Sequence, residues 1–348
     1  MDASGARRWN SYRLLRNYSR RSNLQGALMA MNGYAQTNGT IKPKADFDDE
    51  RAAVELETAM RGFGCDRRRV MRVLTGICNA QRQLIRTPYN KKYSKDLYSE
   101  LKKELSGDFE EVILGLMETP TKYDAYQLHR AIAGVGTAKS VVVEILSSRS
   151  NDELRHVKNE YKTQYGRPLD RDVSDDTSGE FREILLTLLQ CRRDEGHMID
   201  NAKAREEARV LTSGERQRVR TTFKSALTSE NPQQLCKLFA EYRNETGRAI
   251  EDAIEEYFTG DAMELLLALA QCAQNKTTFF ANLLYNSMKG VGTRDRDLIR
   301  LIVSRSEIDL ALVREEFGRL YKKSLIRWIE GECSGAYRDS LIAIVNGN

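Results

Sequence analysis

The sequence predicts an all-α protein built from four repeats of about five short helices each. Apolar residues recur at intervals of three and four, as in the stripe Val70, Val73, Leu74 and Ile77, and the alternation typical of strands is absent. Proline is scarce, with 5 among 348 residues, and a Gly-x-Gly motif occurs three times. Motifs that recur at a fixed period indicate a repeat architecture.

The spacing of the motifs predicts the number of repeats. The first two Gly-x-Gly motifs are 72 residues apart, and the second and last are 156 apart, which is two periods and 12 residues more. A further repeat must lie in that interval, and residues 235–242 and 257–261 do resemble 154–161 and 104–108. The predicted divisions are a tail (1–46), repeat 1 (47–118), repeat 2 (119–190), a linker (191–203), repeat 3 (204–274) and repeat 4 (275–348).

An acidic residue stands 42 positions after the first glycine of each motif, namely Glu104, Asp176 and Glu332. If the helices of a repeat are lettered A to E, the motif lies in the A–B loop and the acid ends helix D. A Ser-Gly pair then begins helix E, with the serine as a natural N-cap. Glycine turns bring main-chain carbonyls together, and a carboxylate completes an all-oxygen site of the kind that calcium prefers. Ordinary helix-capping turns are the alternative, but the recurring acid favours the site.

These motifs together resemble the annexin family. The likeness runs from about residue 47 to 346 and includes the Gly-x-Gly-Thr loops with their distant acids, Tyr123-Asp124-Ala125, and the helix ends at 148–150 and 304–306. The resemblance implies a slightly curved disc of four five-helix repeats. Its convex face is expected to carry calcium sites that dock on acidic phospholipid, and its concave face is expected to hold the N-terminal tail.

The resemblance also implies the residues of each site. Main-chain carbonyls of the A–B loop and the carboxylate of helix D are expected to hold each Ca²⁺, with water or a lipid phosphoryl oxygen at the open positions. The implied ligands are Met60, Gly62, Gly64 and Glu104 in repeat 1, Ile132, Gly134, Gly136 and Asp176 in repeat 2, and Met288, Gly290, Gly292 and Glu332 in repeat 4. Phe63, Val135 and Val291 stand between the glycines, at loop tips expected to contact the membrane.

Repeat 3 departs from this pattern. Tyr257 stands in the place of the acid, three extra residues separate it from Gly214, and we expect no calcium there. A secondary site, formed in the family by the loop threonine and an acid two positions later, is expected only in repeat 4, from Thr293 and Asp295. The stretch from Cys191 to Arg216 is then a candidate surface for protein contacts or for self-association.

Four further charged residues match positions that line a polar channel in the family: Asp124, Glu144, Arg149 and Arg300. We expect them to form buried ion pairs that fix packing, and ion conduction is the alternative. The three histidines are dispersed, no catalytic constellation occurs, and Gly134 to Ser140 lacks the glycine spacing of a phosphate loop. We therefore expect no enzymatic activity.

Charge is unevenly distributed along the chain. The net charge is +5, residues 1–44 sum to +7, and the remaining residues therefore sum to −2, which argues against a nucleic-acid-binding core. In the tail, Trp9, Leu14 and Leu15 are interleaved with arginines such as Arg13, which suits a basic amphipathic helix that binds an anionic membrane or a calcium-sensor groove. A solvated disordered tail is the alternative. The resemblance implies that such a tail recruits a protein partner. Six cysteines without metal-ligand spacing are expected to be reduced thiols.

The resulting hypothesis is a calcium-dependent binder of acidic phospholipid that acts as a reversible peripheral membrane scaffold. We expect it in the cytoplasm and on membranes, with non-classical export left open. The alternative is a calcium-independent membrane or protein adaptor that acts through the basic tail.

Overall fold

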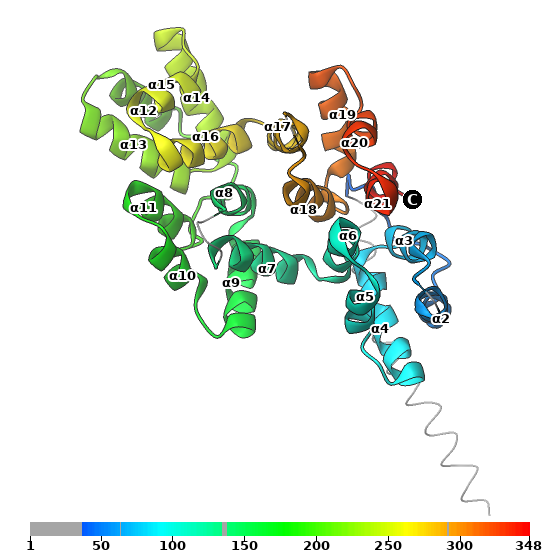
Figure 1. Cartoon of the computed structure of the whole chain (residues 1–348). Helices are drawn as coiled ribbons and strands as arrows, with labels where there is room; N and C mark the ends of the chain where they lie inside the picture. The colour runs from blue at the N-terminus through cyan, green and yellow to red at the C-terminus, as the bar shows by residue number, and fades with distance from the viewer. Residues whose placement is uncertain (1–36, 63, 134–137, 291) are drawn as a thin grey trace, which may run out of the picture. The chain divides into compact units, whose positions relative to one another are not determined.

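The computed structural model describes residues 37–62, 64–133, 138–290 and 292–348. The structure in these ranges consists of twenty helices joined by short loops, with no strand, and it confirms the predicted all-α class (Figure 1). None of these helices is both long and apolar enough to cross a membrane. The Gly-x-Gly residues Phe63, Gly134, Val135, Gly136 and Val291 lie outside the described residues, as do Thr137 and tail residues 1–36.

Each repeat contains five helices, A to E. Those of repeat 1 are α2 (Asp49–Met60), α3 (Arg67–Thr75), α4 (Asn79–Tyr93), α5 (Leu97–Glu104) and α6 (Gly107–Met117). Those of repeat 2 are α7 (Pro120–Ile132), α8 (Lys139–Ser148), α9 (Asn151–Tyr165), α10 (Leu169–Asp176) and α11 (Gly179–Leu188). Those of repeat 3 are α12 (Asn201–Thr212), α13 (Arg216–Ser229), α14 (Pro232–Thr246), α15 (Ile250–Tyr257) and α16 (Gly260–Gln274). Those of repeat 4 are α17 (Lys276–Met288), α18 (Asp295–Arg305), α19 (Leu310–Tyr321), α20 (Leu325–Glu332) and α21 (Gly335–Asn346).

Local sequence signals explain where many of these helices begin and end. The Ser-Arg-Ser motif ends α8 and starts α9, where the Ser150 hydroxyl accepts from the Glu153 N–H at 3.2 Å and the Glu153 carboxylate accepts from the Ser150 N–H at 2.7 Å. This reciprocal capping box satisfies two N–H groups that have no partner inside the helix. Gly166, with φ of 70°, then ends α9.

The N-cap prediction for helix E is right in position and wrong in mechanism. Ser106, Ser178, Thr259 and Ser334 do occupy the N-cap positions, but none of their side chains makes the capping hydrogen bond. The glycine that follows each of them has a φ between 59° and 67°. The Ser-Gly pair therefore starts helix E through a left-handed backbone turn, which glycine adopts without steric cost.

The chain forms two compact units. Of the described residues, one unit contains 37–119 and 286–348, and the other contains those within 120–285. Within the first unit, α6 packs on α18 and α3 packs on α21, so repeats 1 and 4 share an interface. Within the second unit, α8 packs on α16 and α11 on α13, which joins repeats 2 and 3.

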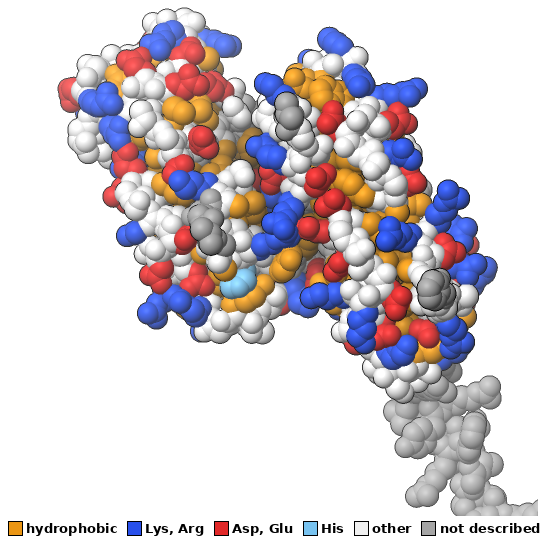
Figure 2. Space-filling view, viewed as in Figure 1, with side chains coloured by type: hydrophobic (Ala, Val, Ile, Leu, Met, Phe, Trp, Pro, Cys, Tyr) orange, Lys and Arg blue, Asp and Glu red, His pale blue; other side chains and the backbone are white. Residues whose placement is uncertain are grey.

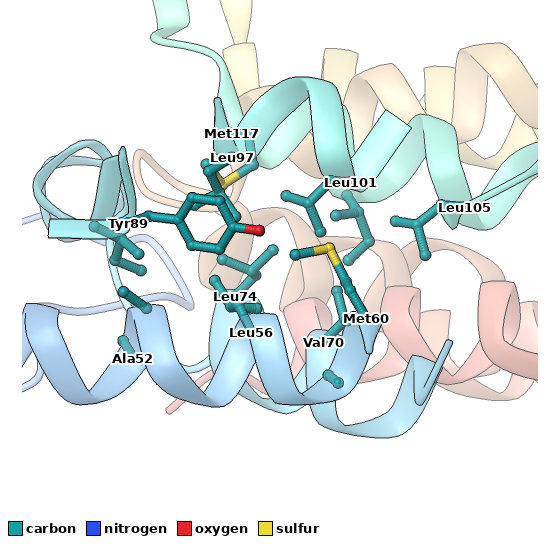
Figure 3. Packing of buried hydrophobic residues seen from close by; sticks show 14 of the residues in the cluster. Ala52, Leu56, Met60, Val70, Leu74, Tyr89, Leu97, Leu101, Leu105 and Met117 are labelled. Carbon is teal, nitrogen blue, oxygen red and sulfur yellow. The ribbon is translucent and has the colours of Figure 1, made fainter. Parts of the chain in front are cut away.

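The core of repeat 1 lies between its own five helices. Figure 3 shows Leu56 and Met60 of α2 directed toward Val70, Leu101 and Leu105. Met60 and Leu105 are 7% and 4% exposed. They flank the A–B loop and the D–E turn respectively, so one apolar cluster holds both segments.

The last residues of the tail are packed on the first unit. The N–H groups of Thr40 and Ile41 donate to the Ser306 carbonyl at 2.7 and 3.0 Å, and the Thr40 hydroxyl donates to the Ile344 carbonyl at 2.6 Å. A Cβ at Gly39 would lie 2.4 Å from the Glu307 carbonyl carbon, so only glycine fits there. Residues 38–41, which the sequence analysis places in the tail, therefore pack on the first unit.

Candidate calcium sites

The A–B loops of repeats 1, 2 and 4 share one length and one closing hydrogen bond. Each loop has six residues, 61–66, 133–138 and 289–294. In each, the N–H of the last loop residue donates to a carbonyl seven residues earlier: Asp66 to Ala59 at 2.8 Å, Ala138 to Ala131 at 2.9 Å, and Arg294 to Ser287 at 2.8 Å. The bond closes the loop just before the first predicted carbonyl ligand of each repeat.

The glycines give these loops a conformation that other residues rarely adopt. Gly62 and Gly290 have φ values of 113° and 107°, and Gly64 and Gly292 have 90° and 85°. The near identity of the two pairs shows that repeats 1 and 4 build the same turn. Gly134 and Gly136 lie outside the described residues, and the closing bond of Ala138 is the part of the repeat 2 loop that can be compared.

The predicted carboxylates stand at one structural position. Glu104, Asp176 and Glu332 are each the last residue of an eight-residue helix D, and all three are exposed. The following residue in each case donates its N–H back into that helix and is buried: Leu105, Thr177 and Cys333. A buried neighbour on one side and an exposed carboxylate on the other fix the direction of the acid toward solvent.

Loop and acid meet in the two repeats where both are described. In repeat 4, the Thr293 hydroxyl donates to a Glu332 carboxylate oxygen at 3.4 Å. In repeat 1, burial and the nearby negative charge of Glu104 raise the pKa of the Cys65 thiol, and Cys65 is an A–B loop residue. The A–B and D–E segments are therefore neighbours, as the constant 42-residue spacing predicts.

This arrangement fits a hard cation. No group of three or more His, Cys, Asp or Glu side chains suitable for a metal occurs in the described part of the chain. The donors that each predicted site offers are main-chain carbonyls and a single exposed carboxylate, a set of oxygens alone. Calcium accepts six to eight oxygen ligands in flexible geometry, so a one-carboxylate loop leaves coordination positions open to other oxygens.

Repeat 3 lacks this six-residue loop, and a longer helix B takes its place. Its A–B connection has three residues, 213–215, and its helix B, α13, has 14 residues where α3, α8 and α18 have 9, 10 and 11. Counted back from the last residue of each helix, Arg220 of α13 stands where Lys139 begins α8. The first turn of α13 thus replaces the A–B loop, and carbonyls within it bond along the helix.

Arginine side chains, which the sequence analysis did not single out, meet the Tyr257 position. Arg216 Nη2 donates to the Tyr257 carbonyl at 3.5 Å, and Arg220 Nη1 donates to the same oxygen. The Arg216 guanidinium carbon is 5.9 Å from the centre of the Tyr257 ring. The spacing of 216 and 220 by one helical turn is the signal in the sequence that places both on one face.

The predicted secondary site in repeat 4 lies in a set of acidic neighbours. Asp295 begins α18 and follows Thr293 by two residues. Burial and the charge of Asp295 raise the pKa of Asp108 at the start of α6. Burial mainly, together with the charges of Asp295, Glu332 and Asp108, raises the pKa of Cys333 to about 11. A cation beside Asp295 would relieve this repulsion.

The residues matched to a polar channel form ion pairs within each unit. Arg149 donates to both carboxylate oxygens of Asp124, at 2.7 and 2.9 Å, and lies 3.9 Å from Glu144. All three are at most 5% exposed. Arg300 belongs to the other unit and pairs with Asp297 at 2.8 Å. Burial opposes the charge of Arg149, and the charge of Asp124 more than offsets it and raises the Arg149 pKa.

Comparison with known proteins identifies relatives over most of the chain. A sequence model of the family named Annexin matches residues 50–116, 123–188, 212–269 and 279–344. Annexin A11 of Homo sapiens is 42% identical over 90% of this chain and 62% of its own length, so the chain spans less than two thirds of that relative. Annexin A4 of Sus scrofa is 41% identical over 90% of this chain and 99% of its own. The crystal structure of a calcium-bound annexin, (Sm)1, has a TM-score of 0.79 at 30% identity and covers 89% of this chain and 93% of its own.

Proposed function

Because the chain belongs to the annexin family, we propose that it is a reversible peripheral membrane scaffold held on acidic phospholipid by calcium at repeats 1, 2 and 4. Calcium-dependent binding of phospholipid is the general function of the family, whose members act without catalysis. The proposal adds the three sites, their ligands and the consequence of losing the fourth. We further propose that the protein resides in the cytoplasm and exchanges with membrane surfaces.

The observation that carries the proposal is the repeated loop. Three A–B loops of equal length and closing bond stand in repeats 1, 2 and 4, which keep an exposed acid at the end of helix D, and repeat 3 lacks both features. Correlated presence and loss is the pattern expected when loop and acid serve one ligand. A purely structural turn would have no reason to keep its carboxylate.

The ligands we propose are the carbonyls of Met60, Gly62 and Gly64 with Glu104 in repeat 1, and the equivalent residues Ile132, Gly134, Gly136 and Asp176, and Met288, Gly290, Gly292 and Glu332, in repeats 2 and 4. Thr293 and Asp295 are proposed for a secondary site in repeat 4. When bound, calcium supplies positive charge that links these oxygens to a lipid phosphate. Gly62, Gly64, Gly290 and Gly292 already have positive φ values without calcium, so we expect little ordering of these loops on binding.

The charge of the body explains why a cation is required. Residues 45–348 sum to −2, and Figure 2 shows acidic and basic side chains interspersed over the visible surface of both units. Such a surface has no strong attraction for an anionic membrane by itself. Three modest sites on one chain act together, because the second and third bind at high effective concentration after the first. Removal of calcium then releases all three.

Vesicle co-sedimentation with a calcium titration tests this function. The triple variant Glu104→Ala, Asp176→Ala and Glu332→Ala is expected to lose calcium-dependent binding to phosphatidylserine vesicles. A matched control removes three exposed carboxylates outside the sites, by Asp152→Ala, Glu206→Ala and Glu255→Ala, and should retain wild-type binding. Equal calcium responses of wild type and triple variant would reject the proposal.

The basic tail supports a second candidate, a calcium-independent adaptor. Its +7 charge over residues 1–44 contrasts with the −2 of the rest of the chain. Because Thr40 and Ile41 bond to the first unit, the informative deletion removes residues 1–36 rather than 1–46. Loss of membrane attachment in the presence of chelator, with the calcium response unchanged, would assign that part of the binding to the tail.

A further inference from the structure

The third repeat places a permanent positive charge at the position where the other repeats have a calcium loop. The first turn of α13 occupies the place of the A–B loop, and Arg216 lies on that turn. The D–E turn beside it is otherwise unchanged: Phe258 donates to the Ile254 carbonyl, and Gly260 has a φ of 60°. Repeat 3 therefore lacks the carboxylate and the A–B loop but keeps the D–E turn that follows the carboxylate in the other repeats.

Repeat 3 presents this charge next to the repeat 2 site. Lys139, which begins α8 beside the repeat 2 loop, pairs with Asp261 at the start of α16. In return, Arg220 of α13 pairs with Glu180 at the start of α11, four residues after Asp176. These two reciprocal pairs bring the D–E turns of the two repeats to one side of the second unit. A membrane contacted by the repeat 2 loop is therefore within reach of repeat 3.

Several charges at this place form ion pairs, whereas the exposed Arg216 and Arg218 of the first turn of α13 form none with the described residues. The Glu180 carboxylate forms ion pairs with Arg220 and with Lys224, the latter at 3.2 Å. Arg216 is exposed and forms no ion pair with any described residue, although the exposed Glu215 precedes it. Its guanidinium is held over the Tyr257 ring and near the Tyr257 carbonyl, so its direction is fixed.

We propose that repeat 3 is a calcium-independent contact for the phosphate groups of anionic lipid, made by Arg216 at the position that calcium takes in the other repeats. The inference rests on the proposed function, since it takes a membrane as the surface to which the second unit binds. A guanidinium offers several N–H donors in a plane that matches phosphate oxygens, and it keeps its charge at every physiological pH. Tyr257 is an aromatic residue with a polar end, which suits the headgroup region of a membrane.

This contact would give the protein a weak attachment before calcium arrives. Binding at repeat 3 would hold the repeat 2 loop close to lipid phosphate and so lower the calcium concentration that repeat 2 requires. In repeat 3 the guanidinium of Arg216 would then replace calcium as the cation that contacts the membrane, and the repeat would keep its membrane contact.

Co-sedimentation of the full chain with phosphatidylcholine–phosphatidylserine vesicles in EGTA tests the inference. Arg216→Gln is expected to lower the partition coefficient about fivefold, the effect of one basic residue near an anionic surface. Tyr257→Glu should lower it similarly, because the new carboxylate would neutralise Arg216 without removing it. Arg243→Gln, which changes the same charge at an exposed arginine of α14 outside these contacts, should bind as wild type does. The difference between Arg216→Gln and wild type should shrink as salt is raised.

Several outcomes would overturn the inference: no binding of wild type to anionic vesicles in EGTA, equal binding by Arg216→Gln, or an equal loss in Arg243→Gln. Thermal unfolding of each variant establishes that the fold is intact. The triple carboxylate variant separates the two proposals, because it should lose only the calcium-dependent increment and keep the binding in EGTA. Failure of the calcium sites and failure of the arginine contact therefore give different results.

Discussion

Replacement of Gly290 by alanine isolates the contribution of loop conformation to calcium binding. Gly290 has a φ of 107°, and a Cβ built there meets nothing within 4 Å. The variant Gly290→Ala therefore introduces no clash, and its whole cost is the backbone conformation that residues with a Cβ rarely adopt. Such strain amounts to about 1–3 kcal/mol.

The loop can avoid this strain only by changing its backbone conformation, which moves the carbonyls that we propose as calcium ligands. A calcium-free loop that has relaxed in this way must regain about 1–3 kcal/mol of strain when calcium binds, which weakens calcium binding at repeat 4 about fivefold to 150-fold. The assay is the calcium midpoint of vesicle binding in a Glu104→Ala, Asp176→Ala background, where repeat 4 is the remaining proposed primary site.

Gly318→Ala is the matched control. Gly318 lies inside α19 without a positive φ, and its added Cβ also meets nothing within 4 Å. Alanine there should stabilise the helix by about 0.5–1 kcal/mol and leave the calcium midpoint unchanged. An unchanged midpoint in Gly290→Ala would refute the reasoning that the left-handed turn directs the ligands.

Two further predictions concern stability of the first unit. Glu307→Ala leaves Arg82, 1% exposed, without the carboxylate that it contacts at 2.9 Å, and should lower the free energy of unfolding in urea by about 3–5 kcal/mol. Glu330→Ala, which breaks an exposed pair, should cost less than about 1 kcal/mol, and equal losses would contradict the argument. Asp108→Asn should stabilise the calcium-free protein at neutral pH. Burial and Asp295 raise the Asp108 pKa, so the wild type loses stability as pH rises through that pKa and the variant does not. The difference between the two unfolding curves should therefore vanish in acid, and a difference independent of pH would point to another cause.

The sequence predicted the helices and the positions of the A–B loops and their acids because these depend on local signals. Apolar spacing places helices, and Gly-x-Gly marks loops whether or not the remaining chain is known. The N-cap mechanism of helix E was predicted wrongly. A Ser-Gly pair such as Ser106-Gly107 can start a helix either through a capping hydrogen bond from the serine or through a left-handed glycine turn. The left-handed glycine that follows each serine starts the helix without the serine side chain.

The ends of the predicted tail and the ion pairs depended on distant partners. Residues 38–42 read as a polar tail, yet they bond to residues more than 260 positions away. Asp124 and Arg149 were assigned as charged residues of interest from a resemblance, and their bidentate pairing follows from the packing of α7 against α8. No local sequence pattern identifies the partner with which a buried charged side chain will form an ion pair.

The sequence by itself determined the number of repeats, the three loops with their acids, and the absence of an acid at Tyr257. Each of these depends only on which residue type stands at a fixed distance along the chain. The sequence also showed that repeat 3 has three extra residues. Only the tertiary structure decided that residues in the place of the A–B loop form the first turn of helix B, and that this turn carries Arg216 to the Tyr257 carbonyl. A helical turn in place of the loop continues the apolar spacing of the helix that follows it. The sequence pattern therefore does not show where helix B begins. The contacts that this turn makes come from residues about 40 positions apart, which meet only when the repeat is packed.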